Sequence, residues 1–378
     1  MREEAAIRGW CPNAWRPMAA GDGLLMRVRP TLGRMSGREM LALCEASLAY
    51  GNGLIDLTNR SGFQLRGVRA RDWGRLVAAL VDAGLVSADP GVEARALLVV
   101  DPAWEQGDDT HRIATELLAR ASELPVLPAK MGFAVDAGGC PLLGAVPADF
   151  RIERDEQGGL MMRLDGRTAG TRIRAGEETS ALIRLAHWFV DSEGRASGRA
   201  ARHHAVLPAW ADGEARPAAS GDRWRPGEHP FGAIYGLPFG QIDARVLAAV
   251  TQRPGASAIR VSPWRMLLVE GVTCDPAEGL VTDPASPLMR IDACPGSPGC
   301  PQATVETRAI ARRLAPHLGG RRLHVSGCAK GCAHPHPTTI VATGRGGRFD
   351  LGFDACAEDA PAGAGLEPDQ LLARLGEE

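Results

Sequence analysis

Apolar positions along the chain predict the same order of structural elements twice. Between Leu24 and Val68, a strand, a turn, an amphipathic helix and two short strands follow one another, and the same order recurs between Gly232 and Val272. Apolar residues at helical spacing mark the helix of the first copy: Met40, Leu41, Cys44 and Leu48. A β-α-β-β unit cannot cover both faces of its sheet, so we expect the copies to pack as a pseudo-symmetric pair. A chance likeness between two common α+β patterns is the alternative.

Two regions outside the repeats predict α/β structure. Helical spacing indicates helices at Thr110–Ser122 and Thr304–Leu314, and a strand is expected within Leu127–Gly138. The segment Ser192–Pro230 is rich in Gly, Ala, Arg and Pro, which is typical of a connector. We therefore expect five parts: 1–75 and 231–278 for the two repeats, 76–200 and 279–378 for the α/β regions, and 201–230 for the connector.

Composition narrows the class of protein. The 378 residues are 45% hydrophobic, enough to fill the cores of more than one domain. The formal net charge is −2, and the 43 basic residues form no run typical of a nucleic-acid-binding arm. No apolar stretch approaches the length of a membrane span, and MREEAAIRGW lacks the apolar core of a signal peptide. These features predict a cytoplasmic enzyme without nucleic-acid or membrane partners.

Four cysteines near the C-terminal end have the spacing of an iron–sulfur site. Cys294 and Cys300 lie in ACPGSPGC, and Cys328 and Cys332 lie in SGCAKGC. Two short cysteine loops can direct four thiolates at one cubane cluster, and the glycines of both loops permit a tight backbone path around it. Zinc is a weaker alternative, because its cysteine pairs are usually two to four residues apart. Disulfides would need an oxidising compartment, and no signal peptide is visible.

The repeat, the cysteine array and their order resemble the superfamily of sulfite and nitrite reductases, which carry sirohaem beside a four-iron cluster. The resemblance covers most of the chain. Within the superfamily, ACPGSPGCPQATVETRAIA and VSGCAKGCAHP look most like the precorrin-3B synthase family, whereas the reductases usually have C-P-N-G-C in place of C-A-K-G-C. The resemblance implies an α+β fold class: duplicated ferredoxin-like β-α-β-β half-domains packed as a pseudo-symmetric pair, plus α/β nitrite/sulfite-reductase-type domains carrying the cluster.

The resemblance also implies a function and its cofactors. The precorrin-3B synthase family consists of oxidoreductases of aerobic cobalamin biosynthesis, monooxygenases that use O2 to hydroxylate precorrin-3A and form a lactone before ring contraction. The implied cofactors are a 4Fe-4S cluster and a mononuclear non-haem iron, with sirohaem as a less favoured alternative. Electrons would come from an external donor, NADH acting through a reductase or ferredoxin.

Basic side chains at four positions match the residues that hold the acetate and propionate groups of sirohaem in the reductases. These positions are Arg27, Arg60, Arg95 and Lys130. Guanidinium groups bind carboxylates through two parallel hydrogen bonds, so several of them suit a tetrapyrrole with eight carboxylates. The second lysine of the reductases is Gly132 here, and one carboxylate contact is therefore missing. We expect the pocket to bind the substrate, precorrin-3A, in place of the cofactor.

Two histidines directly after the array are candidate ligands for the second iron. His334 and His336 lie in CAHPHP, following Cys332, and alternate residues of an extended chain face the same side. Non-haem iron usually takes nitrogen and carboxylate ligands with open positions. A surface His-Pro loop is the alternative, and His203 and His204 are weaker candidates.

Two other functions stay open at this point. One is a sirohaem-dependent sulfite or nitrite reductase, which would bind the tetrapyrrole as a cofactor. The other is an iron–sulfur electron-transfer protein without a substrate of its own. Binding of a polycarboxylate tetrapyrrole separates this last function from the others.

Overall fold

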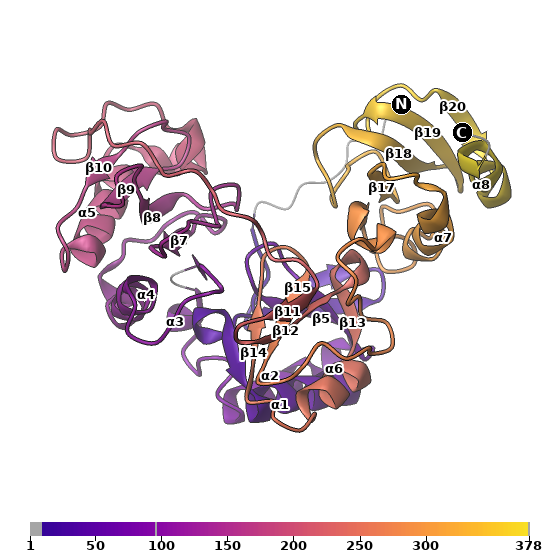
Figure 1. Cartoon of the computed structure of the whole chain (residues 1–378), viewed down its shortest axis with the longest axis horizontal. Coiled ribbons are helices and arrows are strands. Elements are labelled where there is room, and N and C mark those ends of the chain that lie inside the picture. The colour runs from indigo at the N-terminus through magenta and orange to yellow at the C-terminus, as the bar shows by residue number, and fades with distance from the viewer. Residues whose placement is uncertain (1–9, 95–96, 377–378) are drawn as a thin grey trace.

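The computed structural model describes residues 10–94 and 97–376, which form four five-stranded sheets. Two of the sheets make up the central part, and the other two lie on either side of it (Figure 1). Among the described helices, none combines the length and the apolar composition that crossing a membrane requires.

The two central sheets repeat one topology. The first copy contributes β1 (Met18–Ala20), β2 (Gly23–Val28), β3 (Arg34–Ser36), β4 (Leu54–Leu57) and β5 (Phe63–Val68). The second copy contributes β11 (Gly227–His229), β12 (Gly232–Gly236), β13 (Gln241–Asp243), β14 (Ala258–Val261) and β15 (Met266–Glu270). The strand order is β1-β2-β5-β4-β13 in one sheet and β11-β12-β15-β14-β3 in the other. Each copy lends one strand to the sheet of the other, so the predicted pseudo-symmetric pair is confirmed.

The same left-handed turn precedes the exchanged strand in both copies. Leu32 has φ 50° before β3, and Phe239 has φ 60° before β13. Each is followed by a glycine with positive φ, Gly33 at 69° and Gly240 at 72°. Bulky residues rarely adopt this conformation. A rare turn at matching places favours duplication over a chance likeness of patterns.

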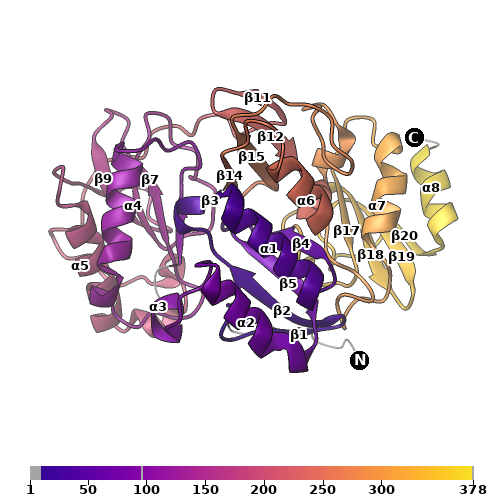
Figure 2. The same cartoon turned by 90° about the horizontal axis from the view of Figure 1, so that it is seen from below.

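Helices α1 (Gly37–Tyr50), α2 (Trp73–Asp82) and α6 (Ala244–Thr251) pack along the central sheets (Figure 2). Side chains cap two of their N-termini: Ser36 Oγ accepts a hydrogen bond from the third residue of the capping box at α1, and Asp243 caps α6. α1 contacts both α2 and α6. Met40, Phe63 and Tyr235 belong to one buried core that joins the two copies.

The first α/β domain has three parallel strands followed by two antiparallel ones. Its strands are β6 (Leu98–Val100), β7 (Phe133–Asp136), β8 (Phe150–Arg154), β9 (Leu160–Leu164) and β10 (Thr171–Arg172). Its helices are α3 (Pro90–Ala94), α4 (Asp109–Ala119) and α5 (Glu178–Asp191). Phe133 and Phe150 stack on the sheet, and Phe189 of α5 meets Phe150 edge-on; all three side chains are buried.

The cysteine-bearing domain repeats this arrangement. Its elements are β16 (Ile291–Ala293), α7 (Arg308–Leu314), β17 (Leu323–Ser326), β18 (Thr338–Arg345), β19 (Arg348–Ala355), β20 (Gly363–Leu366) and α8 (Pro368–Gly376). Here too the first three strands are parallel and the last two antiparallel. A helix follows the first strand and another ends the domain, as α4 and α5 do in the first α/β domain. The duplication therefore extends to both α/β domains.

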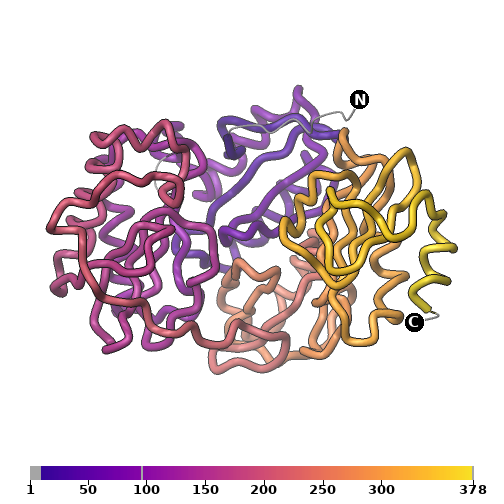
Figure 3. The backbone as a smooth tube through the Cα atoms, turned by 90° about the horizontal axis from the view of Figure 1, so that it is seen from above, coloured from indigo at the N-terminus to yellow at the C-terminus, as the bar shows by residue number. Residues whose placement is uncertain are grey.

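The segment expected as a connector, 201–230, ends in a strand. Figure 3 traces this segment from the first α/β domain toward the central sheets. Trp224 is buried, and β11 begins at Gly227 and forms the edge of a central sheet. A three-residue edge strand beside glycine and proline is too short to produce a periodic signal.

Two buried carboxylates end the first two strands of the first α/β domain. Asp101 follows β6 and Asp136 ends β7, with exposed fractions of 4% and 2%. Burial raises the pKa of Asp101 to about 7 despite the hydrogen bond from Ala103 N, and the charge of Asp136 contributes to the rise. Burial raises the pKa of Asp136 to about 6. The folded state therefore binds protons more tightly here than the unfolded chain does.

Replacing Asp101 with asparagine should stabilise the protein at pH 8 and leave its stability at pH 4 nearly unchanged. Between about pH 4 and pH 7 the folded state binds more protons, so the wild-type free energy of unfolding falls as the pH rises through this window. Asparagine removes that penalty, and the gain is roughly 1–4 kcal/mol. Urea unfolding at both pH values measures it, with the exposed Asp212→Asn as control. Equal pH dependence of the Asp101→Asn variant and the wild type would contradict the assignment.

Candidate functional site

A cavity lined by arginines lies where the central sheets meet the cysteine-bearing domain. Its volume is about 880 Å³, within the range of roughly 300–1,000 Å³ typical of small-molecule sites. The arginines in its wall are Arg27, Arg223, Arg225, Arg265, Arg290, Arg308 and Arg322. The acidic residues in the wall are Asp56 and Asp292. Seven guanidinium groups against two carboxylates leave a strong excess of positive charge, which suits a ligand with several carboxylates.

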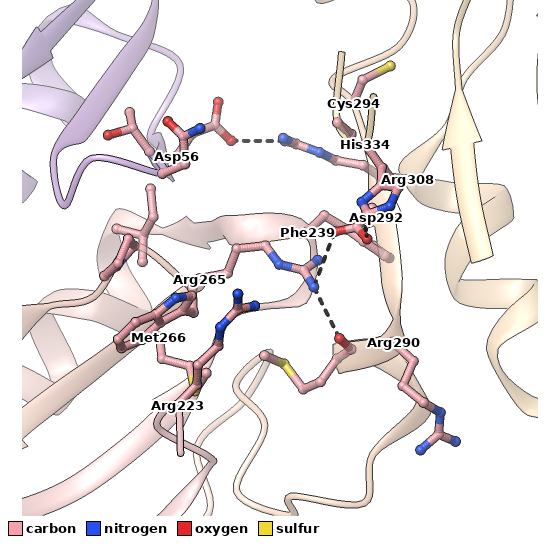
Figure 4. A pocket seen from close by; sticks show the side chains of 18 of the residues that line it. Asp56, Arg223, Phe239, Arg265, Met266, Arg290, Asp292, Cys294, Arg308 and His334 are labelled. Carbon is pink, nitrogen blue, oxygen red and sulfur yellow. Dashed lines mark hydrogen bonds and ion pairs between the residues drawn. The ribbon is translucent and has the colours of Figure 1, made fainter. Parts of the chain in front are cut away.

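The two carboxylates orient part of this arginine set. Arg308 Nη1 lies 3.0 Å from Asp56 Oδ1, and Arg265 Nη2 lies 3.4 Å from Asp292 Oδ1 (Figure 4). Arg322 Nη2 contacts the other oxygen of Asp292 at 3.0 Å. Burial lowers the pKa of Arg265, and the charge of Asp292 acts against that shift. These pairs hold guanidinium groups at the cavity wall, and Arg265 is held further by the carbonyl oxygens of Ile291 and Met289, to which it donates.

Of the four basic residues predicted from the resemblance, Arg27 lines this cavity. Its Nε donates to Gln64 Oε1 at 3.2 Å, and burial lowers its pKa. Arg60 and Lys130 lie together instead, since Arg60 Nη2 donates to the Lys130 carbonyl oxygen at 2.8 Å. Neither belongs to the cavity wall, and Arg95 lies outside the described residues. Their contact with substrate stays a prediction.

The Arg60 side chain has an unused donor. Its Nη1 is buried and has no hydrogen-bond partner among the described residues. Burial lowers the pKa of Arg60 to about 10, and Arg199 and Arg27 are near enough to lower it further. An unpaired buried donor is costly, so this guanidinium is suited to a carboxylate arriving from outside.

The two cysteine loops require the glycines that the sequence places in them. A Cβ on Gly296 would lie 2.7 Å from Thr307 Oγ1, and one on Gly327 would lie 2.6 Å from the Cβ of Ala303. Gly327 N donates to Cys294 Sγ at 3.2 Å, which links the loop after β17 to the loop after β16. The two cysteine loops therefore lie in direct contact.

The four cysteines of the array form a suitable donor set for a cluster. All four are free thiols, and Cys294 and Cys332 line the cavity. Partial burial raises the pKa of Cys332; Lys330 lowers it, and the other three thiols of the array, which are near enough to interact, raise it again. No group of His, Cys, Asp or Glu within the described ranges is arranged to hold a single metal ion. A cubane differs from such a site because each cysteine binds a separate iron.

Three histidines lie next to one another beside the array. His334 lines the cavity, and its Nδ1 is 3.5 Å from Asp292 Oδ2. The ring of His336 is 5.9 Å from that of His334, but His336 is exposed and outside the cavity wall. His203 instead contacts Ser192 Oγ at 2.8 Å within the first α/β domain, and His204 is exposed.

The third of these histidines, His324, was not predicted. It lies in β17, is fully buried, and its ring centre is 6.1 Å from that of His334. Neither ring nitrogen has a hydrogen-bond partner among the described residues, and burial lowers its pKa to about 4. A polar residue within the apolar strand sequence LHV was the available signal.

A buried arginine fastens the first cysteine loop to the central sheet. Arg66, in β5, donates to both carboxylate oxygens of Asp22 at 3.1 and 3.0 Å and to the Gly299 carbonyl oxygen. Gly21 N donates to the same carbonyl at 3.3 Å. The backbone of Gly299, directly before Cys300, is therefore fixed by hydrogen bonds from the central part of the molecule.

Replacing Arg66 with methionine should lower the free energy of unfolding by about 2–4 kcal/mol, because Asp22 would lose its charged partner. Chemical denaturation measures the change. Arg71→Met is the matched control, since the Arg71 side chain is 74% exposed and its ion pair should contribute little. Equal losses of stability in both variants would show that the buried Arg66 ion pair contributes no more to the free energy of unfolding than the exposed one.

Comparison with known proteins relates both the sequence and the fold to characterised chains. Residues 16–83 match the nitrite/sulfite reductase ferredoxin-like half domain. A precorrin-3B synthase from Sinorhizobium sp. is 33% identical over 413 residues, which cover 98% of this chain and 88% of the relative. A ferredoxin–nitrite reductase from Synechococcus elongatus is 23% identical, with 96% of this chain and 87% of the relative covered.

A solved structure shares the fold. The NirA protein of Mycobacterium tuberculosis superposes with a TM-score of 0.58 at 19% sequence identity. The likeness covers 93% of this chain and 79% of that protein. The arrangement of duplicated half-domains and α/β domains is therefore one already seen in solved proteins.

Proposed function

This chain belongs to the precorrin-3B synthase family, and on that premise we propose that it is a monooxygenase that uses O2 to hydroxylate precorrin-3A. The hydroxylated position is the meso carbon later lost in ring contraction, and an adjacent acetate closes a lactone. The reaction belongs to aerobic cobalamin biosynthesis. The enzyme would act in the cytoplasm, with electrons from NADH through a reductase or ferredoxin.

The arginine-lined cavity carries the proposal. Precorrin-3A is a tetrapyrrole with many carboxylates, and the cavity sets seven arginines against two aspartates. Charge-assisted hydrogen bonds from guanidinium groups would fix the orientation of the macrocycle. Cys294 and Cys332 lie in the same wall, so the bound substrate would rest directly beside the cysteine array. An electron-transfer protein without a substrate has no need for such a cavity.

The cysteine array of this chain fits one of the implied cofactors, the cluster. Cys294, Cys300, Cys328 and Cys332 would hold a 4Fe-4S cluster, which supplies electrons one at a time. A mononuclear iron, which supplies the reactivity with O2, would lie at the His334 side of the cavity, with His336 as the second histidine expected from sequence. The protein's own contribution would be to bind the carboxylates and orient the ring.

Gly132 favours a substrate over sirohaem in the tetrapyrrole site. The resemblance expects a second lysine of the reductases at this position. A Cβ on Gly132 would lie 2.5 Å from the Leu97 carbonyl oxygen, a distance that side chains do not tolerate. Gly132 N also donates to Asp149 Oδ2 at 3.1 Å, which fixes the backbone. The local structure therefore leaves no space for that lysine. A sirohaem-dependent sulfite or nitrite reductase is the second candidate function.

Purification without oxygen tests the proposal. We expect a broad brown cluster absorption without sirohaem bands, and conversion of added precorrin-3A to a hydroxylated lactone when O2 and a reductant are supplied. One oxygen atom of the product should carry the label from ¹⁸O2. Strong sirohaem bands together with sulfite or nitrite reduction would establish the reductase instead.

A further inference from the structure

We propose that Asp56 is a positioning residue that holds two ligand-binding arginines, Arg27 and Arg308, at fixed places on the cavity wall. All three residues line the cavity. The inference rests on the proposed function for the class of ligand, a tetrapyrrole that carries carboxylates. It gives an acidic residue a part in binding an anionic molecule.

A row of paired polar residues crosses the first central sheet. Arg27 of β2 is paired with Gln64 of β5, and Gln64 is paired with Asp56 of β4. Asp56 is paired in turn with Gln241 of β13, the strand that the second copy lends to this sheet. Paired positions on adjacent strands direct their side chains to the same face of a sheet. We call these four residues the polar row.

The other face of the same sheet is apolar. Successive residues of a strand point to opposite faces. Chain neighbours of the polar row belong to the buried core that joins the two copies: Met26, Ile55, Leu65 and Ile242. The polar row is therefore turned away from that core, and Arg27, Gln64 and Asp56 of the row line the cavity.

Hydrogen bonds join the side chains of the polar row. Arg27 Nε donates to Gln64 Oε1 at 3.2 Å, and Gln64 Nε2 donates to Asp56 Oδ2 at 3.3 Å. Gln241 Nε2 donates to Asp56 Oδ1 at 3.1 Å, and Arg66 Nε lies farther off, 4.0 Å from Asp56 Oδ2. The Asp56 carboxylate thus fixes the Gln64 amide with its oxygen toward Arg27, because the amide can donate only from its nitrogen.

Arg308 reaches the same carboxylate from the cysteine-bearing domain. Its Nη1 lies 3.0 Å from Asp56 Oδ1 (Figure 4), and its Nε is buried without a hydrogen-bond partner among the described residues. An unpaired buried donor is costly, which suits a ligand carboxylate at this nitrogen. Arg308 begins α7, and the residue before it, Thr307, donates to the Cys294 carbonyl oxygen at 2.5 Å. Asp56 therefore holds a guanidinium group directly beside the first cysteine loop.

Net charge and positioning predict opposite effects of removing the Asp56 carboxylate. A negative charge in the wall repels an anionic ligand, so net charge alone predicts tighter binding after its removal. Positioning predicts weaker binding, because an asparagine amide nitrogen would face the donors of Gln64, Gln241 or Arg308. The guanidinium groups of Arg27 and Arg308 would lose their fixed places, and a less preorganised site binds more weakly.

Anaerobic titration with uroporphyrin III, a stable tetrapyrrole with acetate and propionate side chains, tests the sign of the effect. Trp224 and Trp264 line the cavity, so quenching of tryptophan fluorescence reports binding. Asp56→Asn should bind at least about tenfold more weakly than the wild type. Asp165→Asn is the matched control and should bind like the wild type, because Asp165 pairs with Arg151 outside the cavity wall.

Gln64→Met is the second variant, and it breaks the polar row without changing any charge. It should also weaken binding, and combining it with Asp56→Asn should give a less than additive loss, since residues of one network are coupled. Circular dichroism and sulfide content of each variant should match those of the wild type.

Unchanged or tighter binding by folded Asp56→Asn would overturn the inference, as would unchanged binding by Gln64→Met if Asp56→Asn does not fold. Wild-type protein that binds no uroporphyrin III would overturn it as well. Wild-type protein that binds uroporphyrin III but does not convert precorrin-3A would contradict the proposed function and leave the positioning role of Asp56 intact.

Discussion

Replacing Cys300 with serine should abolish the iron–sulfur cluster. Cys300 lies in the loop that Arg66 and Gly21 anchor through the Gly299 backbone, so its position is fixed and no other cysteine of that loop can replace it. A serine hydroxyl is a poor substitute for the thiolate that these clusters require. We expect the broad visible absorption and the acid-labile sulfide of anaerobically purified protein to fall to background. Cys328→Ser should have the same effect.

Cys140→Ser is the matched control for these variants. Cys140 is an exposed cysteine of the first α/β domain, outside the array. Its replacement should leave absorption and sulfide unchanged. If both Cys300→Ser and Cys328→Ser retain an intact cluster spectrum, the four-cysteine assignment is wrong.

Exchanging Arg223 and Arg225 for glutamine should weaken binding of precorrin-3A by about a hundredfold or more. Both side chains are exposed and line the cavity, so their removal should disturb binding without disturbing the fold. A hydrogen bond to a charged group contributes roughly 1.5–3 kcal/mol, and every 1.4 kcal/mol corresponds to a tenfold change in affinity. Anaerobic spectroscopic titration with precorrin-3A measures the dissociation constant.

A nearby arginine separates local contact from loss of net charge. Arg216→Gln removes a charge from the same segment but outside the cavity wall, and it should change the affinity little. The affinity of the wild type should also fall with added salt more steeply than that of the double variant, because screened charges contribute less. Unchanged binding in the double variant would show that these arginines do not contact the substrate.

The central repeat was predictable because its helices and its longer strands have enough residues to show a periodic pattern of apolar positions. The last strand expected in each copy, before Val68 and before Val272, corresponds to β5 and to β15. The exchange of β3 and β13 was not predictable, because three-residue strands carry no register information. The duplication of the α/β domains was equally hidden: their sheets match in topology, while their loops differ in length and chemistry.

The part of the site that could be predicted is the part formed by residues close together in the sequence. The cysteine array and its glycines could be identified because close approach to a cluster restricts residue type along a few consecutive positions. The cavity arginines come from segments far apart in the chain, among them Arg27, Arg223 and Arg322. His324 lies in β17, and the pairing of that strand with β16 places it beside Asp292. Such residues become a group only through strand pairing and domain contact, which single-sequence patterns do not encode.

The doubled α/β sheet has an evolutionary consequence. Cys294 directly follows β16, and Asp101 directly follows β6, the corresponding strand of the other copy. In one α/β domain this position holds Cys294, a proposed cluster ligand, and in the other it holds a buried carboxylate whose raised pKa makes the stability of the sheet depend on pH. Selection on the cysteine-bearing domain would act through binding of the cluster, and selection on the first α/β domain through its folding. Sequence drift should therefore be slow around Cys294 and faster around Asp101.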